Sequence, residues 1–163
     1  MKRRAYIDIE TTGLSKHYAE LTVIGIGLEK GNSVEITQLI EKKLRADKIL
    51  ESLLGVDEIY SYNGSRFDLP FINAKLGIDL NRLFKHTDLM YDCWRHNLKG
   101  GLKAVEIKLG IERELKNIDG RKAVWLWWQY INNCDSKALK MLLEYNREDV
   151  VNLRTLRVNL GVE

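Results

Sequence analysis

The most informative stretch of the chain is Ala5-Tyr6-Ile7-Asp8-Ile9-Glu10, near its start. Apolar and polar side chains alternate along it, and a period of two predicts a β-strand. Asp8 and Glu10 lie two residues apart, so both carboxylates project from the same face of this strand. Carboxylates held close together either take a raised pKa or bind cations. Two acids that face solvent on an edge strand are the more common case, so Asp-x-Glu alone does not show whether the pair binds a cation or only faces solvent.

The segments that follow extend this strand into an α/β pattern. Further strands are expected at 21–28, 33–39, 56–62 and 84–89, and helices at 46–54, 70–77, 102–109, 121–131 and 135–158. The turn Gly31-Asn32 joins the second and third strands as an antiparallel hairpin, since so short a connection cannot make a parallel crossover. Later strands alternate with helices, so we expect a mixed five-stranded sheet with an antiparallel second strand, flanked by helices.

Length and composition predict one globular domain over residues 1–163, with 45% hydrophobic and 30% charged residues. No apolar run approaches the roughly 20 residues that a membrane span needs. Asp8 and Glu10 follow the basic start at once, which leaves no apolar signal segment. We therefore expect a cytoplasmic protein without a membrane partner. The two cysteines, Cys93 and Cys134, have no CxxC spacing, which excludes a cysteine-based zinc site.

The charge of the chain is unevenly distributed. The net charge is only +3, but eight Lys/Arg stand against four acids between Arg95 and Lys122. A local positive excess attracts polyanions such as nucleic acid. A solvated helix surface explains the same pattern and is the more common case.

Two further acids are expected near the end of the first strand. Asp68 follows Asn63-Gly64 at a strand-to-helix junction, where an N-cap is the simplest role of an aspartate. Asp149 lies one turn after Tyr145 on an otherwise apolar helix stripe, and a carboxylate there needs a charge partner. The members of the stripe are Leu142, Tyr145, Asp149, Leu153 and Leu156, whereas Glu144 and Glu148 are expected to face solvent.

Taken together, the acids predict a metal site at the carboxyl ends of parallel strands, where ligand sites of open α/β sheets lie. Asp8, Glu10, Asp68 and Asp149 come from three segments. Clustered oxygen ligands without His or Cys suit Mg²⁺ or Mn²⁺. Two such ions about 4 Å apart stabilise the attacking and leaving oxygens of a phosphoryl displacement.

Three motifs carry a resemblance to a known family. They are Asp8-Ile9-Glu10-Thr11-Thr12-Gly13-Leu14, Tyr62-Asn63-Gly64-x-x-Phe67-Asp68 and Tyr145-x-x-x-Asp149. They resemble the motifs of DEDD-type (DnaQ-like) 3′–5′ exonucleases, which have the RNase H-like fold. Tyr145 is typical of the DEDDy subgroup. The histidine subgroup would have His at position 144, where this sequence has Glu144. Leu102-Lys103-Ala104-Val105-Glu106 and residues 142–150 look most like the YprB-like ribonuclease-H-superfamily exonucleases, relatives of family B polymerase proofreading domains.

This resemblance implies a metal-dependent 3′–5′ exonuclease that releases nucleoside monophosphates from single-stranded 3′ ends of DNA or RNA. It implies that four acids bind two divalent cations, Mg²⁺ or Mn²⁺, with Asp8 bridging both and Tyr145 positioning the attacking water. The implied catalytic residues are Asp8, Glu10, Asp68, Tyr145 and Asp149. The implied substrate-binding residues are Thr11, Thr12, Gly13, Leu14, Asn63 and Phe67.

Two alternatives stay open, since a fold does not determine where a strand is cut. One is a structure-specific endonuclease on the same fold, and the other is a catalytically silent nucleic-acid-binding module. The segment Val124-Trp125-Leu126-Trp127-Trp128 adds a further question. Trp125 and Trp128 lie off the face expected to be core, where they could stack on bases or contact a partner. Core packing between helices is the favoured interpretation.

Overall fold

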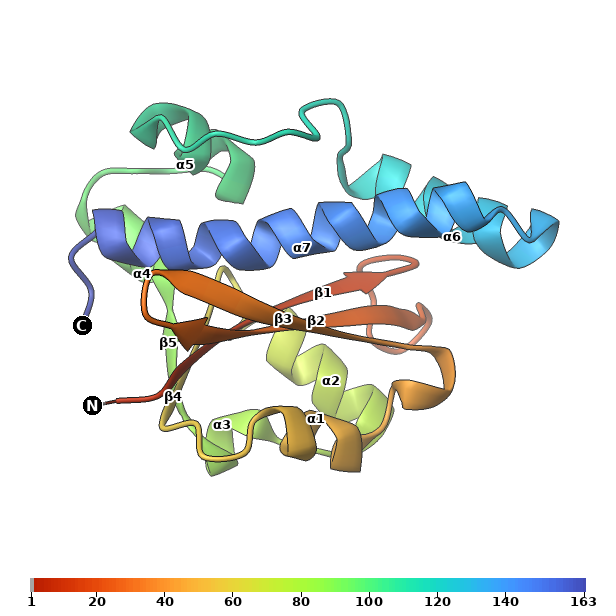
Figure 1. The fold of residues 1–163 in the computed structure, drawn as a ribbon, viewed down its shortest axis with the longest axis horizontal. Helices are drawn as coiled ribbons and strands as arrows, with labels where there is room; N and C mark the ends of the chain where they lie inside the picture. Colours follow the sequence, from red (N-terminus) through yellow and green to blue (C-terminus); the bar gives the residue numbers. More distant parts are fainter. Residues whose placement is uncertain (1) are drawn as a thin grey trace.

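A five-stranded mixed sheet lies at the centre of the computed structural model, which describes residues 2–163 (Figure 1). Its strands are β1 (Arg4–Thr11), β2 (Leu21–Lys30), β3 (Ser33–Ile40), β4 (Glu58–Ser61) and β5 (Lys85–Asp88). Their order in the sheet is β3-β2-β1-β4-β5. β1 pairs antiparallel with β2 and parallel with β4, β2 pairs antiparallel with β3, and β4 pairs parallel with β5. The expected α/β sheet with an antiparallel second strand is therefore confirmed.

Helices cover both faces of this sheet (Figure 1). One face carries α1 (Ala46–Ser52), α2 (Asp68–Leu76) and α3 (Leu80–Leu83); the other carries α4 (Leu89–Arg95), α5 (Leu102–Leu109), α6 (Gly120–Asn133) and α7 (Ser136–Asn159). The 3₁₀ turn η1 (Glu41–Lys43), α3 and α4 are absent from the sequence prediction, because η1 and α3 are too short to show periodicity and α4 follows directly on β5. Within residues 2–163, no helix combines the length and the apolar character that crossing a membrane requires.

The alternation along β1 separates two hydrophobic cores. Ile7 and Ile9 are buried with side chains of α1 and α2, whereas Tyr6 is buried on the opposite face with side chains of α4, α5 and α7. Asp8 and Glu10 share the face of Tyr6. The strand therefore presents its two acids to α7, the longest helix.

Glycines in β2 allow α7 to lie close against the sheet. A Cβ atom at Gly25 would lie 2.3 Å from Oδ1 of Asn146 and 2.8 Å from Cγ2 of Val150. A Cβ atom at Gly27 would lie 2.6 Å from Cγ1 of Val150. The absence of side chains at these positions therefore sets the distance between the sheet and the part of α7 that carries Asp149.

We expect Gly25→Ala to lower the free energy of unfolding by about 1–3 kcal/mol, because the new methyl group overpacks the contact with Asn146. Urea unfolding measures this difference. Gly120→Ala is the matched control, since no atom lies within 4 Å of a Cβ atom built there. An equal loss in both variants would show that close approach of α7 is not the cause.

The exposure of α6 corrects one expectation. Ala123, Leu126 and Trp127 are buried, but Trp125 is 48% exposed and Trp128 is 37% exposed. The prediction that these two tryptophans pack in the core is therefore wrong. The reason is that α6 packs mainly against α7, so only one of its faces is covered.

Candidate active site

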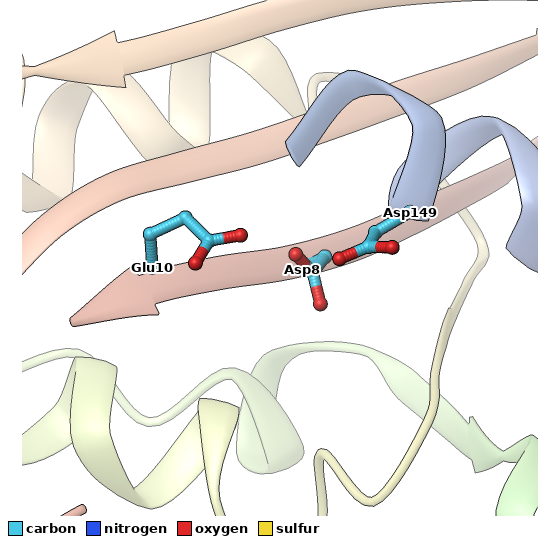
Figure 2. Close-up of side chains that lie close together, drawn as sticks. All are labelled: Asp8, Glu10 and Asp149. Carbon is cyan, nitrogen blue, oxygen red and sulfur yellow. The ribbon is translucent and has the colours of Figure 1, made fainter. Parts of the chain in front are cut away.

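Three carboxylates from two distant segments meet beside the carboxyl end of β1. Asp8 and Glu10 project from β1, and Asp149 reaches them from α7 (Figure 2). One oxygen of each side chain lies within 4.8 Å of one oxygen of each of the others. Glu10 and Asp149 are buried. The structure thus brings together three of the four acids that the sequence analysis selects.

Asp68 lies next to this group but has a different contact. It is the first residue of α2, and its Oδ1 accepts a hydrogen bond of 3.1 Å from the N–H of Ile9. Tyr6 is the last residue of β1 that pairs with β4, and Ile9 lies beyond it. The carboxylate of Asp68 therefore accepts a hydrogen bond from a backbone N–H that β4 leaves unpaired. The carboxylate does not cap α2, and the N-cap interpretation is therefore wrong.

Burial raises the pKa of all four carboxyl groups. The pKa values of Asp8 and Glu10 lie well above their usual range, because burial and then the charge of Asp149 disfavour ionisation. Burial raises the pKa of Asp68 to about 7 despite the hydrogen bond from Ile9. Burial raises the pKa of Asp149 to about 6, with Arg113 acting against the shift. Ionised together, these groups destabilise the fold unless a cation neutralises them.

Arg113 is the charge partner that Asp149 requires. Its Nη2 donates a hydrogen bond to Oδ1 of Asp149, and its Nε and Nη2 donate bonds of 2.9 and 2.8 Å to the two oxygens of Glu106. Both Arg113 and Glu106 are buried. From the sequence, Arg113 is predicted only to belong to a basic stretch, because the loop between α5 and α6 has no periodicity that would place its side chain.

Glu148 also differs from its expected solvent-facing position. Its carboxylate accepts hydrogen bonds from the backbone N–H groups of Glu114 and Leu115, and it lies 3.7 Å from Nη1 of Arg113. Glu148 therefore holds the loop that carries Arg113 against α7.

Asn146 positions Asp8 and is missing from the predicted site. Its Nδ2 donates hydrogen bonds of 3.0 Å to Oδ2 of Asp8 and 3.2 Å to the backbone oxygen of Asp8. Its Oδ1 accepts a bond of 2.9 Å from Nε2 of Gln38. The available signal is its place on α7, three residues before Asp149 and hence on the same face.

Tyr145 is buried one turn before Asp149. Burial, followed by the negative charge of Asp149, raises its pKa above the usual value of a phenol. The hydroxyl therefore stays protonated, and it can donate a hydrogen bond but is a poor base. Nζ of Lys103 lies 4.4 Å from the centroid of its ring.

Two adjoining cavities flank the carboxylates and share Asp119 and Gly120. The first has a volume of 280 Å³ and is lined by Asp8, Tyr62, Gly101, Leu102, Lys103, Asp119, Gly120, Tyr145 and Asp149. The second has a volume of 440 Å³ and is lined by Ile9, Glu10, Thr11, Gly13, Leu14, Phe67, Asp119, Gly120, Arg121 and Val124. The carboxylates therefore border an open groove that α5 and α6 complete.

The loop after β1 gives the second cavity its shape. Oγ1 of Thr11 donates a hydrogen bond of 2.7 Å to the backbone oxygen of Gly13, and Oγ1 of Thr12 accepts one of 2.8 Å from the N–H of Glu20. Leu14 follows with 89% of its surface exposed. Thr11, Gly13 and Leu14 line the cavity. Thr12 does not line it, and its hydroxyl instead joins the two ends of the loop through Glu20.

Asn63 shapes the loop between β4 and α2. Its φ is 60°, and its N–H donates a bond of 2.7 Å to Oδ1 of Asp88. Asp88 also accepts bonds from the N–H and the hydroxyl of Ser65. The segment that leads to Phe67 and Asp68 is thus held by Asp88, the last residue of β5. Asp88 is not part of the motifs and is missing from the predicted site.

This geometry agrees with comparisons with known proteins. The family model of the RNase_H superfamily matches residues 5–161. The chain belongs to the RNase H superfamily. This chain is also similar to the uncharacterized protein YprB of Bacillus subtilis (strain 168), with 28% identity over 172 residues. The alignment covers 96% of this RNase H superfamily chain and 41% of YprB, so the chain spans about two-fifths of that relative.

Solved structures share the fold of this RNase H superfamily chain. Brucella melitensis NrnC with bound Mg²⁺ superposes with a TM-score of 0.64 at 23% identity, covering 97% of this chain and 71% of NrnC. NrnC bound to pGG gives the same TM-score at 20% identity and the same coverage. An E. coli ExoI–ssDNA complex superposes with a TM-score of 0.52 at 14% identity, covering 88% of this chain and 43% of ExoI. These similarities confirm the RNase H-like fold that the sequence motifs imply.

Proposed function

We propose that this chain is a metal-dependent 3′–5′ exonuclease acting on single-stranded DNA or RNA and releasing nucleoside monophosphates. The observation that carries the proposal is the approach of Asp8, Glu10 and Asp149 to within 4.8 Å beside Tyr145 in an open groove. The structural neighbours NrnC with bound Mg²⁺, NrnC bound to pGG and ExoI in complex with single-stranded DNA support the same class of substrate.

The donor set fits hard divalent cations. It consists of carboxylate oxygens alone, which Mg²⁺ and Mn²⁺ prefer. Among residues 2–163, Arg113 forms an ion pair with Asp149, whereas Asp8, Glu10 and Asp68 form none. In the proposal, Asp8, Glu10 and Asp149 would hold one divalent cation, and Asp68 would support a second together with Asp8. Bound cations would stabilise the charge on the attacking and leaving oxygens of the phosphodiester.

The protein's own groups have separate roles in the proposed reaction. Tyr145 donates a hydrogen bond that orients the attacking water, and Asn146 holds the carboxylate of Asp8 in place. Leu14 and Phe67 border the cavity next to Glu10, where they would contact the terminal base. Thr11 and Gly13 offer backbone groups beside them.

Polarity and mode of cleavage are tested with 5′-labelled single- and double-stranded DNA and RNA, together with circular single strands, each with Mg²⁺, Mn²⁺ or EDTA. We expect ladders that shorten from the 3′ end and release mononucleotides, only with a divalent cation, while circles resist. Cleavage of circles would favour the structure-specific endonuclease. Binding without hydrolysis of any substrate would favour the catalytically silent module.

The stability of the metal-free protein should fall as pH rises. Asp149 and Asp68 have folded-state pKa values of about 6 and about 7, above the usual value of 3.8. Between pH 4 and 7 the folded state thus binds more protons than the unfolded state, and the stability present at low pH is lost as pH rises. We expect Tm in EDTA to fall by roughly 5–10 °C between pH 5 and 8.

Mn²⁺ should remove most of this pH dependence, because a bound cation replaces the protons and stabilises the folded state. Thermal unfolding at several pH values, with Mn²⁺ or with EDTA, measures the effect. Glu35→Gln removes an exposed acid of β3 and serves as the control that keeps the wild-type profile. A Tm in EDTA that rises with pH would contradict the proposed cation site.

A further inference from the structure

Two tryptophans of α6 lie at the centre of its uncovered side. Residues 121, 125 and 128 are spaced by four and three and share one face of the helix. The opposite face is buried through Ala123, Leu126 and Trp127. A tryptophan that is 48% or 37% exposed leaves a large aromatic surface in water, and two on one face form an apolar patch that a ligand could cover.

This stripe is continuous with the cavity next to Glu10. Arg121 lines that cavity, and Trp125 and Trp128 follow it along the helix. Figure 1 shows that α6 begins near the carboxyl end of β1 and extends beyond the sheet beside α7. From Arg121 to Trp128 the helix rises by about 10 Å, which matches about three stacked nucleotides.

The charge of α6 favours a polyanion over a basic or neutral occupant. Its 14 residues include two cations, Arg121 and Lys122, and no acid. Nζ of Lys122 lies 3.5 Å from the centroid of the Trp125 ring. The nearest acid along the chain is Asp119, whose carboxylate already accepts the N–H of Lys122 as the N-cap. Cations beside exposed aromatic rings are the combination that binds single-stranded nucleic acid without sequence preference.

We propose that Arg121, Trp125 and Trp128 form a stacking surface for the part of a single strand that extends out of the cavity at Glu10. The proposal rests on the proposed function, because it takes the end of the strand to lie at the carboxylates. Trp125 and Trp128 stack on bases, and Arg121 and Lys122 contact the phosphates that join them. The surface adds affinity for strands longer than about three nucleotides.

Binding is tested with fluorescein-labelled dT10 and rU10 by anisotropy, in EDTA and in the Asp8→Asn background, so that binding is read without cleavage. We expect Trp125→Ala and Trp128→Ala each to weaken binding about 5- to 100-fold, and Trp125→Phe to retain most of the affinity. Trp94→Ala removes a tryptophan of α4 with 42% exposure and is the matched control without loss. Arg121→Ala should lower the slope of log K against log salt by about 0.7.

The readouts separate this inference from the proposed function. With Mn²⁺, the ratio of kcat/KM on dT10 to kcat/KM on a dinucleotide should fall in Trp125→Ala as much as the affinity for dT10. Undiminished binding of dT10 by both alanine variants would overturn the stacking surface even if the wild type is an exonuclease. Tryptophan-dependent binding without hydrolysis would overturn the exonuclease and keep the surface. A wild-type dimer that Trp125→Ala and Trp128→Ala dissociate, with unchanged dT10 binding, would assign the face to a second copy of the chain instead.

Discussion

Asp8→Asn is expected to reduce Mn²⁺-dependent cleavage of a single-stranded oligonucleotide by at least about 10³-fold, since cation stabilisation of a phosphoryl transition state is worth several kcal/mol. Asp8 lies in the group of three carboxylates, and Asn146 holds it there. Asparagine keeps an oxygen that accepts this hydrogen bond but removes the charge. End-labelled substrates in Mn²⁺ measure the loss, and Glu35→Gln should retain full activity.

The same variant should unfold at an unchanged or higher Tm in EDTA at pH 8, because it relieves repulsion from Glu10 and Asp149. Its gain in Tm on adding Mn²⁺ should be smaller than that of the wild type. Asp149→Asn should be the less stable of the two aspartate variants in EDTA, since it removes a charge partner of Arg113. Retained cleavage by Asp8→Asn, or equal Mn²⁺ shifts in variant and wild type, would mean that cations bind elsewhere.

Local periodicity was sufficient to predict the sheet and the acids on it. Two-residue alternation identifies β1, and the same alternation puts Asp8 and Glu10 on one face. A stripe with steps of three and four places Tyr145 and Asp149 together on α7. The parallel pairing of β1 with β4 then brings the start of α2, with Asp68, beside the end of β1. Each of these predictions depends on a residue spacing or a strand pairing that regular secondary structure determines.

Contacts made by irregular segments could not be predicted in this way. Arg113 lies between α5 and α6, where no period indicates which way a side chain points. Asp88 ends a strand of four residues, and its hydrogen bonds to the loop after β4 depend on how β4 and β5 pair. The exposure of Trp125 depends on which neighbours α6 has, which helical spacing does not state. Tertiary packing decides all three.

Arg113→Met should produce the largest loss of stability, about 3–5 kcal/mol in the free energy of unfolding. The guanidinium is buried between Glu106 and Asp149, and its removal leaves the buried carboxylate of Glu106 without a charge partner. The remaining side-chain donor to Glu106 in the described chain is Nδ2 of Asn152, at 3.1 Å. Urea unfolding at neutral pH measures the loss. Arg82→Met, at an exposed ion pair with Asp79, should cost less than about 1 kcal/mol.

The double variant Glu106→Gln/Arg113→Met separates a buried charge from lost packing. If the uncompensated charge of Glu106 is the cause, the double variant should be more stable than Arg113→Met alone, and the coupling energy should exceed about 1 kcal/mol. Mn²⁺ should restore part of the stability of Arg113→Met, because a cation at the carboxylates then neutralises Asp149 in place of the guanidinium. A loss of stability in the double variant equal to the sum of the losses in the two single variants would show that the charge of Glu106 is not the reason why Arg113→Met is destabilising.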